Sequence, residues 1–438
     1  MEKIKKAFKR TATSLTLIVL VALGARMGFA TNQVHKMPRE VLGTIPFENE
    51  TGNIAYALAT GKGFSSPFQK ETGPTAWLTP VYPLLVAGVF HAFGTFTAGS
   101  FFAVVFLNAL FSAAACIPIF FAGRKIGGVA TASGAAWLWA LFPNAVMMPF
   151  EWVWDTSLAA LLGALLFWAT VELSESAQST RNWCAYGLLW GFALMTNPAL
   201  GSLLPFLVGW ATYRGWRMAE HSALKPALAL GIAILCCVPW TVRNYVVFHK
   251  LVPLRSNFPL ELYIGNNNNY ATRQFVWPPK ITKEREILRY FRLGETAFME
   301  EEGQKAMEFI RAHPRIAVEL VGERIVAFWT GIAEPVQVWR ITDSVLIRAL
   351  MLCNTLAAVG ALLGIAVLIG KRSPYMIPAA AFPVVFPWLY YVTHPNLRYR
   401  HPIDPVVLLL VAVAAASAWD MLTRRRNFAA PVTVGQGG

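Results

Sequence analysis

Charged residues and recognisable nucleotide- or metal-binding motifs are scarce in this chain. Only 14% of its 438 residues are charged, whereas 55% are hydrophobic. These proportions exclude an ordinary soluble protein and indicate a membrane protein with several spans. The sequence also has no Walker A loop, no GxGxxG that opens a helix after a strand, no HExxH and no paired CxxC. Nucleotide-driven transport and zinc hydrolysis therefore lack their usual signatures.

Cysteine is sparse as well. All five cysteines lie in or at the edge of apolar runs, and none has the spacing of metal ligands: Cys116, Cys184, Cys236, Cys237 and Cys353. We interpret them as small buried hydrophobic residues, without a disulfide framework.

Basic residues outnumber acidic ones, with 38 Lys and Arg against 24 Asp and Glu, for a net charge of +14. In a membrane protein such an excess usually holds short loops on the cytoplasmic side. We therefore expect no nucleic-acid partner.

Ten apolar segments are candidate spans, because a helix needs about 20 apolar residues to cross a bilayer. They lie near 12–30, 98–122, 128–147, 156–173, 183–196, 199–213, 224–242, 345–369, 374–393 and 402–421. The basic segment MEKIKKAFKR precedes the first of them. A cleaved signal peptide ending near Ala30 is the alternative, but the length of the run and Arg26 near its end favour an uncleaved span.

Residues 80–94 are also apolar but short, and the basic residues decide whether they span. If 80–94 lie on the outer surface, the outer loops at 148–155 and 197–198 carry no Lys or Arg. The short inner loops then carry Arg124, Lys125, Arg181, Arg214, Arg217, Lys225, Lys371, Arg372 and Arg424 to Arg426. This agrees with the positive-inside rule. We therefore expect both termini in the cytoplasm and residues 47–94 on the outer surface.

The predicted organisation has four parts. They are an N-terminal transmembrane module (1–242) whose outer loops carry the chemistry, a periplasmic loop with surface helices (243–343), C-terminal transmembrane helices (344–426) and a disordered tail (427–438). In the first outer loop, Phe47, Ile54 and Leu58 recur at helical spacing behind a cap at Asn49 or Thr51, which predicts a helix lying flat on the membrane. Residues 314–332 predict a second surface helix, with a small soluble cap as the alternative for the long loop.

Candidate functional residues gather in the predicted outer loops. A carboxylate can accept the proton of an attacking hydroxyl, and arginines can bind a phosphate and stabilise its charge as it leaves. The candidate catalytic residues are Glu50, Glu48 and Asp155, and the candidate donor- or acceptor-binding residues are Arg243, Arg255, Asn266, Arg398, Arg400 and His401. Simpler interpretations exist: solvated charges for the glutamates, a helix cap for Asp155, and headgroup anchors for the arginines.

Several strings resemble a known family. ETGNIAYALATGKGFSSPF, TGPTAWLTPVYPLLVAGVF, PWTVRNYVVF, LRSNFPLELYIGNN and LRYRHPIDP are similar to a bacterial branch of the GT-C fold membrane glycosyltransferases. The group most resembled is glycosyltransferase family 39, which includes protein O-mannosyltransferases and the aminoarabinose transferase of lipid A. The resemblance covers residues 10 to 422 and implies an all-α polytopic GT-C-type fold with about ten transmembrane helices.

The resemblance also implies a function. A sugar carried on polyprenyl phosphate would be transferred, with inversion, to an acceptor on the periplasmic side of the bacterial inner membrane. The family's general base falls on Glu50 or Glu48, its second acid on Asp155, and its lipid-phosphate arginines on Arg398 and Arg400. The family usually has an Asp-Glu or Asp-Asp pair where this chain has Glu48-Asn49-Glu50, so either glutamate fits, and Glu50 is preferred because it adjoins the Thr-Gly-Asn-Ile-Ala run.

Three alternatives stay open at this point. A lipid-linked glycan polymerase or ligase would use similar outer-loop arginines, and a flippase or transporter or an inactive scaffold would use none of this chemistry. No cofactor is required by the sequence, although two acidic loops allow a divalent cation in an oxygen site. The sugar, the acceptor class and the oligomeric state are not determined by the sequence.

Overall fold

The computed structural model describes residues 13–38, 45–151, 153–175, 179–218, 223–271, 284–331 and 345–429. The predicted basic N-terminal segment, most of the predicted tail and two stretches of the long outer loop (272–283 and 332–344) lie outside the described residues. Within the described part the secondary structure is helical, with one isolated bridge between Ser65 and Pro74 and no strand. The predicted all-α class is therefore confirmed.

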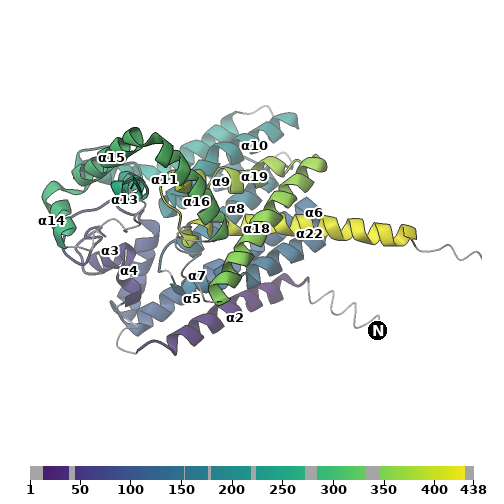
Figure 1. Cartoon of the computed structure of the whole chain (residues 1–438), viewed down its shortest axis with the longest axis horizontal. Coiled ribbons are helices and arrows are strands. Elements are labelled where there is room, and N and C mark those ends of the chain that lie inside the picture. Colours follow the sequence, from purple (N-terminus) through teal and green to yellow (C-terminus); the bar gives the residue numbers. More distant parts are fainter. Residues whose placement is uncertain are drawn as a thin grey trace, which may run out of the picture.

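Apolar helices, long ones together with shorter ones, form a bundle (Figure 1). They are α2 (Leu15–Val34), α5 (Ala98–Ala114), α6 (Cys116–Leu141), α7 (Pro143–Glu151), α8 (Thr156–Leu173), α9 (Thr180–Thr196), η3 (Pro198–Leu203), α10 (Leu204–Arg217), α11 (Leu224–Phe248), α18 (Val345–Gly370), α19 (Met376–Val384), α20 (Trp388–Val392) and α22 (Asp404–Ala429). Helices thus occupy all ten predicted segments. Six runs of the described chain are long and apolar enough to cross a membrane, which makes this a multi-pass membrane protein. The count of ten spans stays a prediction.

One of those six runs, Ala98–Leu141, contains a reversal. Gly127 (φ −144°, ψ 16°) and Gly128 (φ 77°, ψ −170°) leave the helical conformation inside α6, and glycine allows the positive φ. After the reversal the chain packs back on itself. The indole nitrogen of Trp139 donates to the Ser112 carbonyl at 2.7 Å, and a Cβ on Gly123 would lie 2.9 Å from the Cα of Ala132. The two predicted spans here therefore form a tight antiparallel hairpin.

Shorter helices form a cap at one end of the bundle. They are η2 (Ile45–Phe47), α3 (Glu50–Ala59), α4 (Val81–Phe93), α12 (Phe258–Gly265), α13 (Asn268–Ala271), α14 (Glu284–Leu293), α15 (Glu295–Ala312), α16 (Pro314–Thr330) and α21 (Leu397–Arg400). With 13 residues, α4 is too short to cross a bilayer, and it runs across the direction of α2 and α22 (Figure 1).

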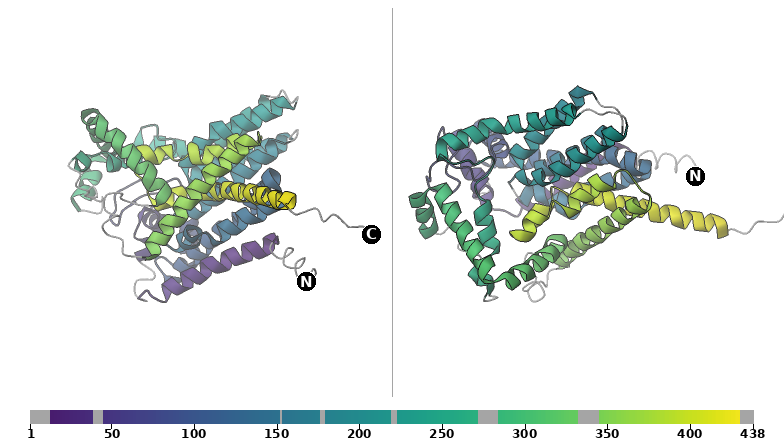
Figure 2. Two further views of the ribbon diagram at one scale, coloured as in Figure 1. Left: turned by 45° about the vertical axis from the view of Figure 1, so that its right-hand side comes forward. Right: turned by 90° about the horizontal axis from the view of Figure 1, so that it is seen from above.

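The described ends of the chain lie away from this cap. The beginning of α2 and the end of α22 both lie toward the opposite end of the bundle, as both views of Figure 2 show. Which side of the membrane either end faces stays a prediction of the charge pattern.

The cap has an apolar core of its own, which the sequence reasoning missed. Phe68 packs edge-on against Trp77 and Tyr290, with ring centroids 5.2 Å apart in both pairs, and Tyr290 packs against Phe298 at 5.4 Å. The long outer loop supplies Tyr290 and Phe298 to this core, and the first outer loop supplies Phe68 and Trp77. The two outer segments are therefore joined through a shared interior.

The apolar face of α3 was predicted to lie on the membrane, and this is wrong for its buried residues. Phe47 and Ile54 are 0% exposed inside the protein. Phe47 packs on Phe90 of α4 with ring centroids 4.8 Å apart. The pattern that predicts an amphipathic helix does not distinguish lipid from protein as the apolar partner.

Candidate active site

A buried carboxylate ties the cap together. Glu295 accepts hydrogen bonds from the Ala76 amide at 2.7 Å and from the hydroxyls of Ser256 and Tyr290, both at 2.6 Å. The hydroxyl of Thr75 also donates to it. Four donors from three segments meet at one side chain, so Glu295 fixes the first outer loop against the long loop.

Arg243, predicted to bind the donor, also holds the first outer loop in place. Its guanidinium donates to the carbonyls of Thr75 and Phe64, both at 2.7 Å, and lies 5.0 Å from the ring centroid of Trp240. Arg243 therefore supports the loop that follows α3, and we leave it out of the proposed site.

Two adjoining cavities lie beneath this scaffold. The first, of about 600 Å³, contains Glu50, and the second, of about 380 Å³, contains Asp155. Five residues line both cavities: Trp154, Arg255, Glu261, Arg398 and Tyr399. Predicted residues from four outer segments thus meet around one space, with a carboxylate on either side and two arginines between them.

Glu50 is placed by the start of α3. Asn49 is the N-cap, and its side-chain oxygen accepts the Gly52 amide at 3.0 Å, so one of the two predicted caps is found. Gly52 is required here, because a Cβ would lie 2.1 Å from the Phe47 carbonyl oxygen. Glu50 is the first residue of the helix, where the helix dipole favours a negative charge.

Burial raises the pKa of the Glu50 carboxyl above its ordinary value, and Glu261 acts in the same direction. Arg398 and Arg255 oppose this shift, because positive charge favours the carboxylate. A raised pKa makes Glu50 a better proton acceptor than an ordinary surface glutamate.

Glu48 lies differently. It is exposed, and it lines both the first cavity and a further pocket on the other side of α3. The structure therefore distinguishes the two glutamates that the sequence left open, with Glu50 in the shared space and Glu48 at its edge.

Asp155 stands directly before α8. It was interpreted alternatively as a helix cap, but its side chain makes no capping hydrogen bond. Its carboxylate instead accepts the Asn197 amide at 3.0 Å. Burial raises the pKa of the Asp155 carboxyl, against the opposing effect of Arg255 and Arg398.

The two arginines of the shared wall are held by neighbours. The guanidinium of Arg398 stacks on Trp154 at 3.6 Å from the ring centroid and donates to the Tyr399 hydroxyl at 3.2 Å. Arg255 donates through Nε to the Trp77 carbonyl at 3.0 Å. Stacking and hydrogen bonding fix both side chains in the orientation in which they line the cavities.

Three residues that line the Glu50 cavity were missed by the sequence reasoning. Glu261 lies 3.5 Å from Nδ1 of His394, and the other ring nitrogen of His394 lies 3.4 Å from the Tyr399 hydroxyl. Glu261 lies in the string LRSNFPLELYIGNN, and His394 lies just before the string LRYRHPIDP. In both places the sequence analysis selected only other polar residues. Their proximity depends on packing between distant segments.

Three predicted binding residues lie elsewhere. Arg400 is 0% exposed and donates to Asp404 at 2.7 Å, to the Trp329 carbonyl at 2.9 Å and to Asn354 at 2.7 Å. His401 is buried against Trp139, with ring centroids 5.0 Å apart, and the Asn266 amide donates to the Val392 carbonyl at 2.9 Å. Residues of a short helix point in different directions, so Arg398 and Tyr399 of the LRYRH string line the cavities, whereas Arg400 and His401 do not.

The divalent cation that the acidic loops allow stays a prediction of the sequence. No group of three or more His, Cys, Asp or Glu side chains in the described ranges is placed to hold one. The carboxylates of Glu50 and Asp155 instead have the guanidinium groups of Arg255 and Arg398 as neighbours. We therefore derive no chemical step through a metal.

Comparisons with known proteins give a fold. No protein-family model and no curated protein sequence matches the chain. Similar solved structures include the oligosaccharyltransferase of Archaeoglobus fulgidus in the apo form (TM-score 0.54, 14% identity, 94% of this chain and 51% of that chain). They also include the same archaeon's oligosaccharyltransferase AglB in complex with an inhibitory peptide and a dolichol-phosphate (TM-score 0.56, 14% identity, 99% and 53%).

A third similar structure is the Archaeoglobus enzyme in complex with Zn and sulfate (TM-score 0.50, 13% identity, 94% and 50%). The chain spans about half the length of the structures that it matches. At these identities the likeness shows the fold alone, which is the predicted GT-C-type membrane fold with surface helices and a long outer loop.

Proposed function

We propose that the protein is a membrane glycosyltransferase that moves a sugar from a polyprenyl-phosphate donor to an acceptor, with inversion at the anomeric carbon. We place the reaction on the periplasmic side of a bacterial inner membrane, where the positive-inside rule puts the cap. One observation carries the proposal: Glu50, Asp155, Arg255 and Arg398 line two adjoining cavities at one end of a GT-C-type bundle.

In the proposed step Glu50 is the general base. An acceptor hydroxyl or amine attacks the anomeric carbon while its proton passes to the Glu50 carboxylate. The bond from that carbon to the phosphate oxygen breaks, and the electron pair leaves with polyprenyl phosphate. The raised pKa of Glu50 supports this role, because a more basic carboxylate accepts a proton more readily.

Arg398 and Arg255 are proposed to hold the donor phosphate. Both line the wall between the cavities, so a phosphate at that wall meets positive charge while the sugar faces Glu50. Arginine suits this role, because its planar fork binds phosphate oxygens and its charge stabilises the leaving group. Asp155, held by Asn197, is proposed to orient the acceptor or the base from the second cavity.

A lipid-linked donor is supported at the level of the fold. The similar AglB structure holds a dolichol-phosphate, and a shared bundle can present a lipid-borne phosphate from the same direction.

Two glutamine or asparagine substitutions and one control separate this proposal from a flippase or an inactive scaffold. Only an enzyme loses donor turnover when its base is removed.

The experiment uses purified full-length protein in lipid vesicles with short-chain polyprenyl-phosphate sugars, and follows donor consumption by mass spectrometry. We expect Glu50→Gln to slow consumption by at least about 100-fold, the lower range for loss of a general base. Asp155→Asn is expected to slow it less. Glu48→Gln, a matched change two residues away on the exposed side, is expected to slow consumption far less than Glu50→Gln.

The outcomes are distinct when each variant elutes as one species. Loss of turnover in Glu48→Gln but not in Glu50→Gln would move the base to Glu48. Equal behaviour of all four proteins, with or without turnover, would remove the catalytic role of the carboxylates and favour the flippase or scaffold.

A further inference from the structure

A third pocket lies beside the α3 segment and adjoins the cavity that contains Glu50. Its volume is about 340 Å³, at the small end of the range for ligand sites. It shares Glu48, Asn53, Phe68 and Gln69 with the cavity that contains Glu50, but neither arginine lines it. A ligand in this pocket would therefore reach the Glu50 cavity across a common wall of four side chains.

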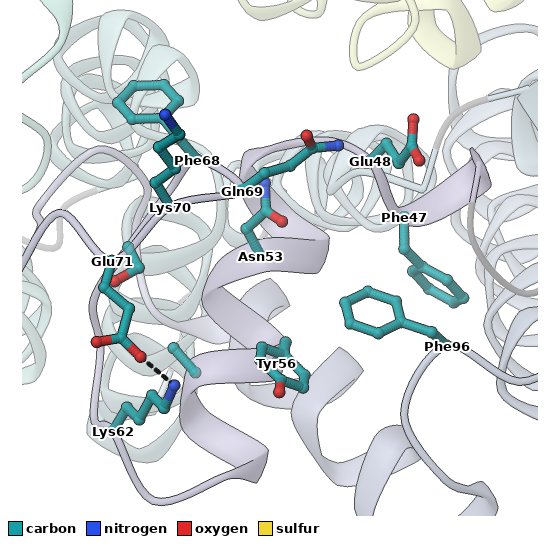
Figure 3. A pocket seen from close by; sticks show the side chains of 12 residues that line it. Phe47, Glu48, Asn53, Tyr56, Lys62, Phe68, Gln69, Lys70, Glu71 and Phe96 are labelled. Atoms are coloured by element: carbon teal, nitrogen blue, oxygen red, sulfur yellow. Dashed lines mark hydrogen bonds and ion pairs between the residues drawn. The ribbon is translucent and has the colours of Figure 1, made fainter. Parts of the chain in front are cut away.

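The pocket has an aromatic side and a polar side (Figure 3). The ring of Phe96 lies 5.1 Å from that of Tyr56 and 6.2 Å from that of Phe47, measured between centroids. Glu48, Asn53 and Gln69 lie together along the opposite edge, where Asn53 is held by a hydrogen bond from its amide to the Pro67 carbonyl at 3.1 Å.

The charges of the lining balance. Two lysines and two glutamates are present, and Lys62 is paired with Glu71 at one end, as the dashed line in Figure 3 shows. A pocket with no excess of either sign has no preference for a phosphate or a carboxylate. Aromatic rings opposite side-chain amides instead suit a neutral ligand that has both C–H faces and hydroxyl groups.

Backbone strain is concentrated at the same pocket. In the described ranges, four residues other than glycine have positive φ, and Ser66 (φ 55°) and Phe96 (φ 53°) both line it. Such conformations cost free energy in a bulky residue and persist where the surrounding structure holds them. Phe96 thus places an aromatic ring in the pocket at a backbone conformation that glycine would adopt at a lower cost in free energy.

From these observations we propose that this pocket binds an uncharged saccharide part of the acceptor. The inference rests on the proposed function and adds the acceptor class. Inversion requires the attacking oxygen and the leaving phosphate on opposite sides of the anomeric carbon. With the phosphate at Arg398 and Arg255, the acceptor arrives from a part of the cap away from both arginines, and this pocket adjoins the Glu50 cavity without being lined by either of them.

Other acceptors fit the pocket less well. A polyprenyl or acyl chain would leave the polar edge and the ion pair against hydrocarbon, which is unfavourable. A charged peptide segment would find no excess of opposite charge. A sugar ring places its C–H face on Tyr56 and Phe96 and directs hydroxyls toward the amides.

The test measures binding separately from turnover. Neutral mono- and disaccharides are titrated against full-length protein in lipid nanodiscs by saturation-transfer NMR, on the Glu50→Gln background so that no chemistry occurs. We expect binding that Tyr56→Ala and Gln69→Ala each weaken about tenfold, which corresponds to about 1.4 kcal/mol. Tyr56→Phe keeps the ring and is expected to retain most of the affinity.

Matched controls come from the same cap. Phe291→Ala removes an exposed aromatic ring of α14, and Gln304→Ala removes an exposed amide of α15. Neither residue lines this pocket, so both variants are expected to bind saccharides as the parent does. In the active protein, Tyr56→Ala is expected to raise the acceptor KM with little change in kcat.

Three results would overturn the inference. They are absence of saccharide binding, binding that the control changes weaken equally, and loss of peptide binding rather than saccharide binding in Tyr56→Ala. If donor turnover depends on Glu50 in each of these cases, the proposed function stands without this acceptor site. If saccharides bind as expected but no donor is consumed, the proposed function fails and the pocket remains a saccharide site.

Discussion

Glu50 is the residue on which the proposed chemistry depends, and its neighbours set its protonation. Burial and Glu261 raise its pKa, whereas Arg398 and Arg255 lower it. The same two arginines are placed to hold a phosphate. Donor binding and the strength of the base are therefore coupled, because a bound phosphate neutralises the charges that favour the Glu50 carboxylate.

This coupling predicts the pH dependence of transfer. Glu50 must be ionised to accept a proton, so kcat/KM should rise with pH, and a raised pKa puts the midpoint of that rise above the ordinary glutamate value of 4.5. Removing the negative charge at Glu261 with Glu261→Gln should move the midpoint to lower pH. Removing the positive charge with Arg398→Gln should move it to higher pH.

Initial rates of donor consumption across a pH series measure this midpoint. Glu48→Gln is the control and should leave it unchanged, because Glu48 is not among the groups that shift Glu50. Shifts of the opposite sign, or an equal shift in all three variants, would show that another group controls the rate.

At the scale of the element, the sequence does not indicate how helix α2 is held against the other helices of the bundle. Arg26 is only 1% exposed although it lies in an apolar run. Its guanidinium donates to the Ser112 hydroxyl at 2.8 Å, to the Ala140 carbonyl at 3.0 Å and to the Trp139 carbonyl at 3.2 Å. A charge inside a membrane protein is costly unless it is bonded in this way, and here it joins α2 to α5 and α6.

Arg26→Met tests this attachment. The methionine side chain is shorter, unbranched and apolar and has no donor, which leaves the partner groups in α5 and α6 without these bonds. We expect about 1–3 kcal/mol of lost stability for buried groups left unsatisfied. Thermal unfolding in detergent, followed by differential scanning fluorimetry, should show a clearly lower Tm.

Arg124→Met is the matched control, because Arg124 is exposed at the turn of the hairpin. It should unfold at the wild-type temperature. A Tm for Arg26→Met equal to that of the control would mean that apolar packing alone holds α2.

At the scale of the whole molecule, the proposed chemistry belongs to the cap at one end of the bundle. The cap gathers the two cavities and the saccharide pocket at one end, and the described chain ends lie at the other (Figures 1 and 2). For a lipid-linked donor this polarity matters, because the phosphate must lie at the membrane surface while its polyprenyl chain stays in the bilayer.

The polarity predicts which side each end faces. A cysteine at Gln69 should be labelled by a membrane-impermeant maleimide in intact cells, because the residue is exposed on the cap. A cysteine at Lys371, exposed in a predicted inner loop, should be labelled only after the membrane is opened. The native cysteines should be replaced by alanine or serine first, and the reverse pattern would place the cap in the cytoplasm.

The sequence alone determined the features that depend on local composition and on order along the chain. Apolar runs of sufficient length give the helices and the membrane setting, and Asn49 before Glu50 gives the start of α3. The same sequence selected Glu50 and Asp155 as outer-loop carboxylates able to accept a proton, and Arg255 and Arg398 as outer-loop arginines able to bind a phosphate. Those four residues do line a common space in the structure.

Only the tertiary structure decided which of the selected residues share that space. Arg398 and Arg400 are two residues apart, yet one faces the cavities and the other is fully buried beside Asp404. Glu261 comes from the long outer loop, whereas His394 and Tyr399 come from the last one, and no local pattern indicates that these two loops meet. Contacts between residues far apart in the sequence depend on how the helices pack. For that reason the sequence did not indicate the cap core, the structural role of Arg243 or the pocket that is proposed to bind a saccharide.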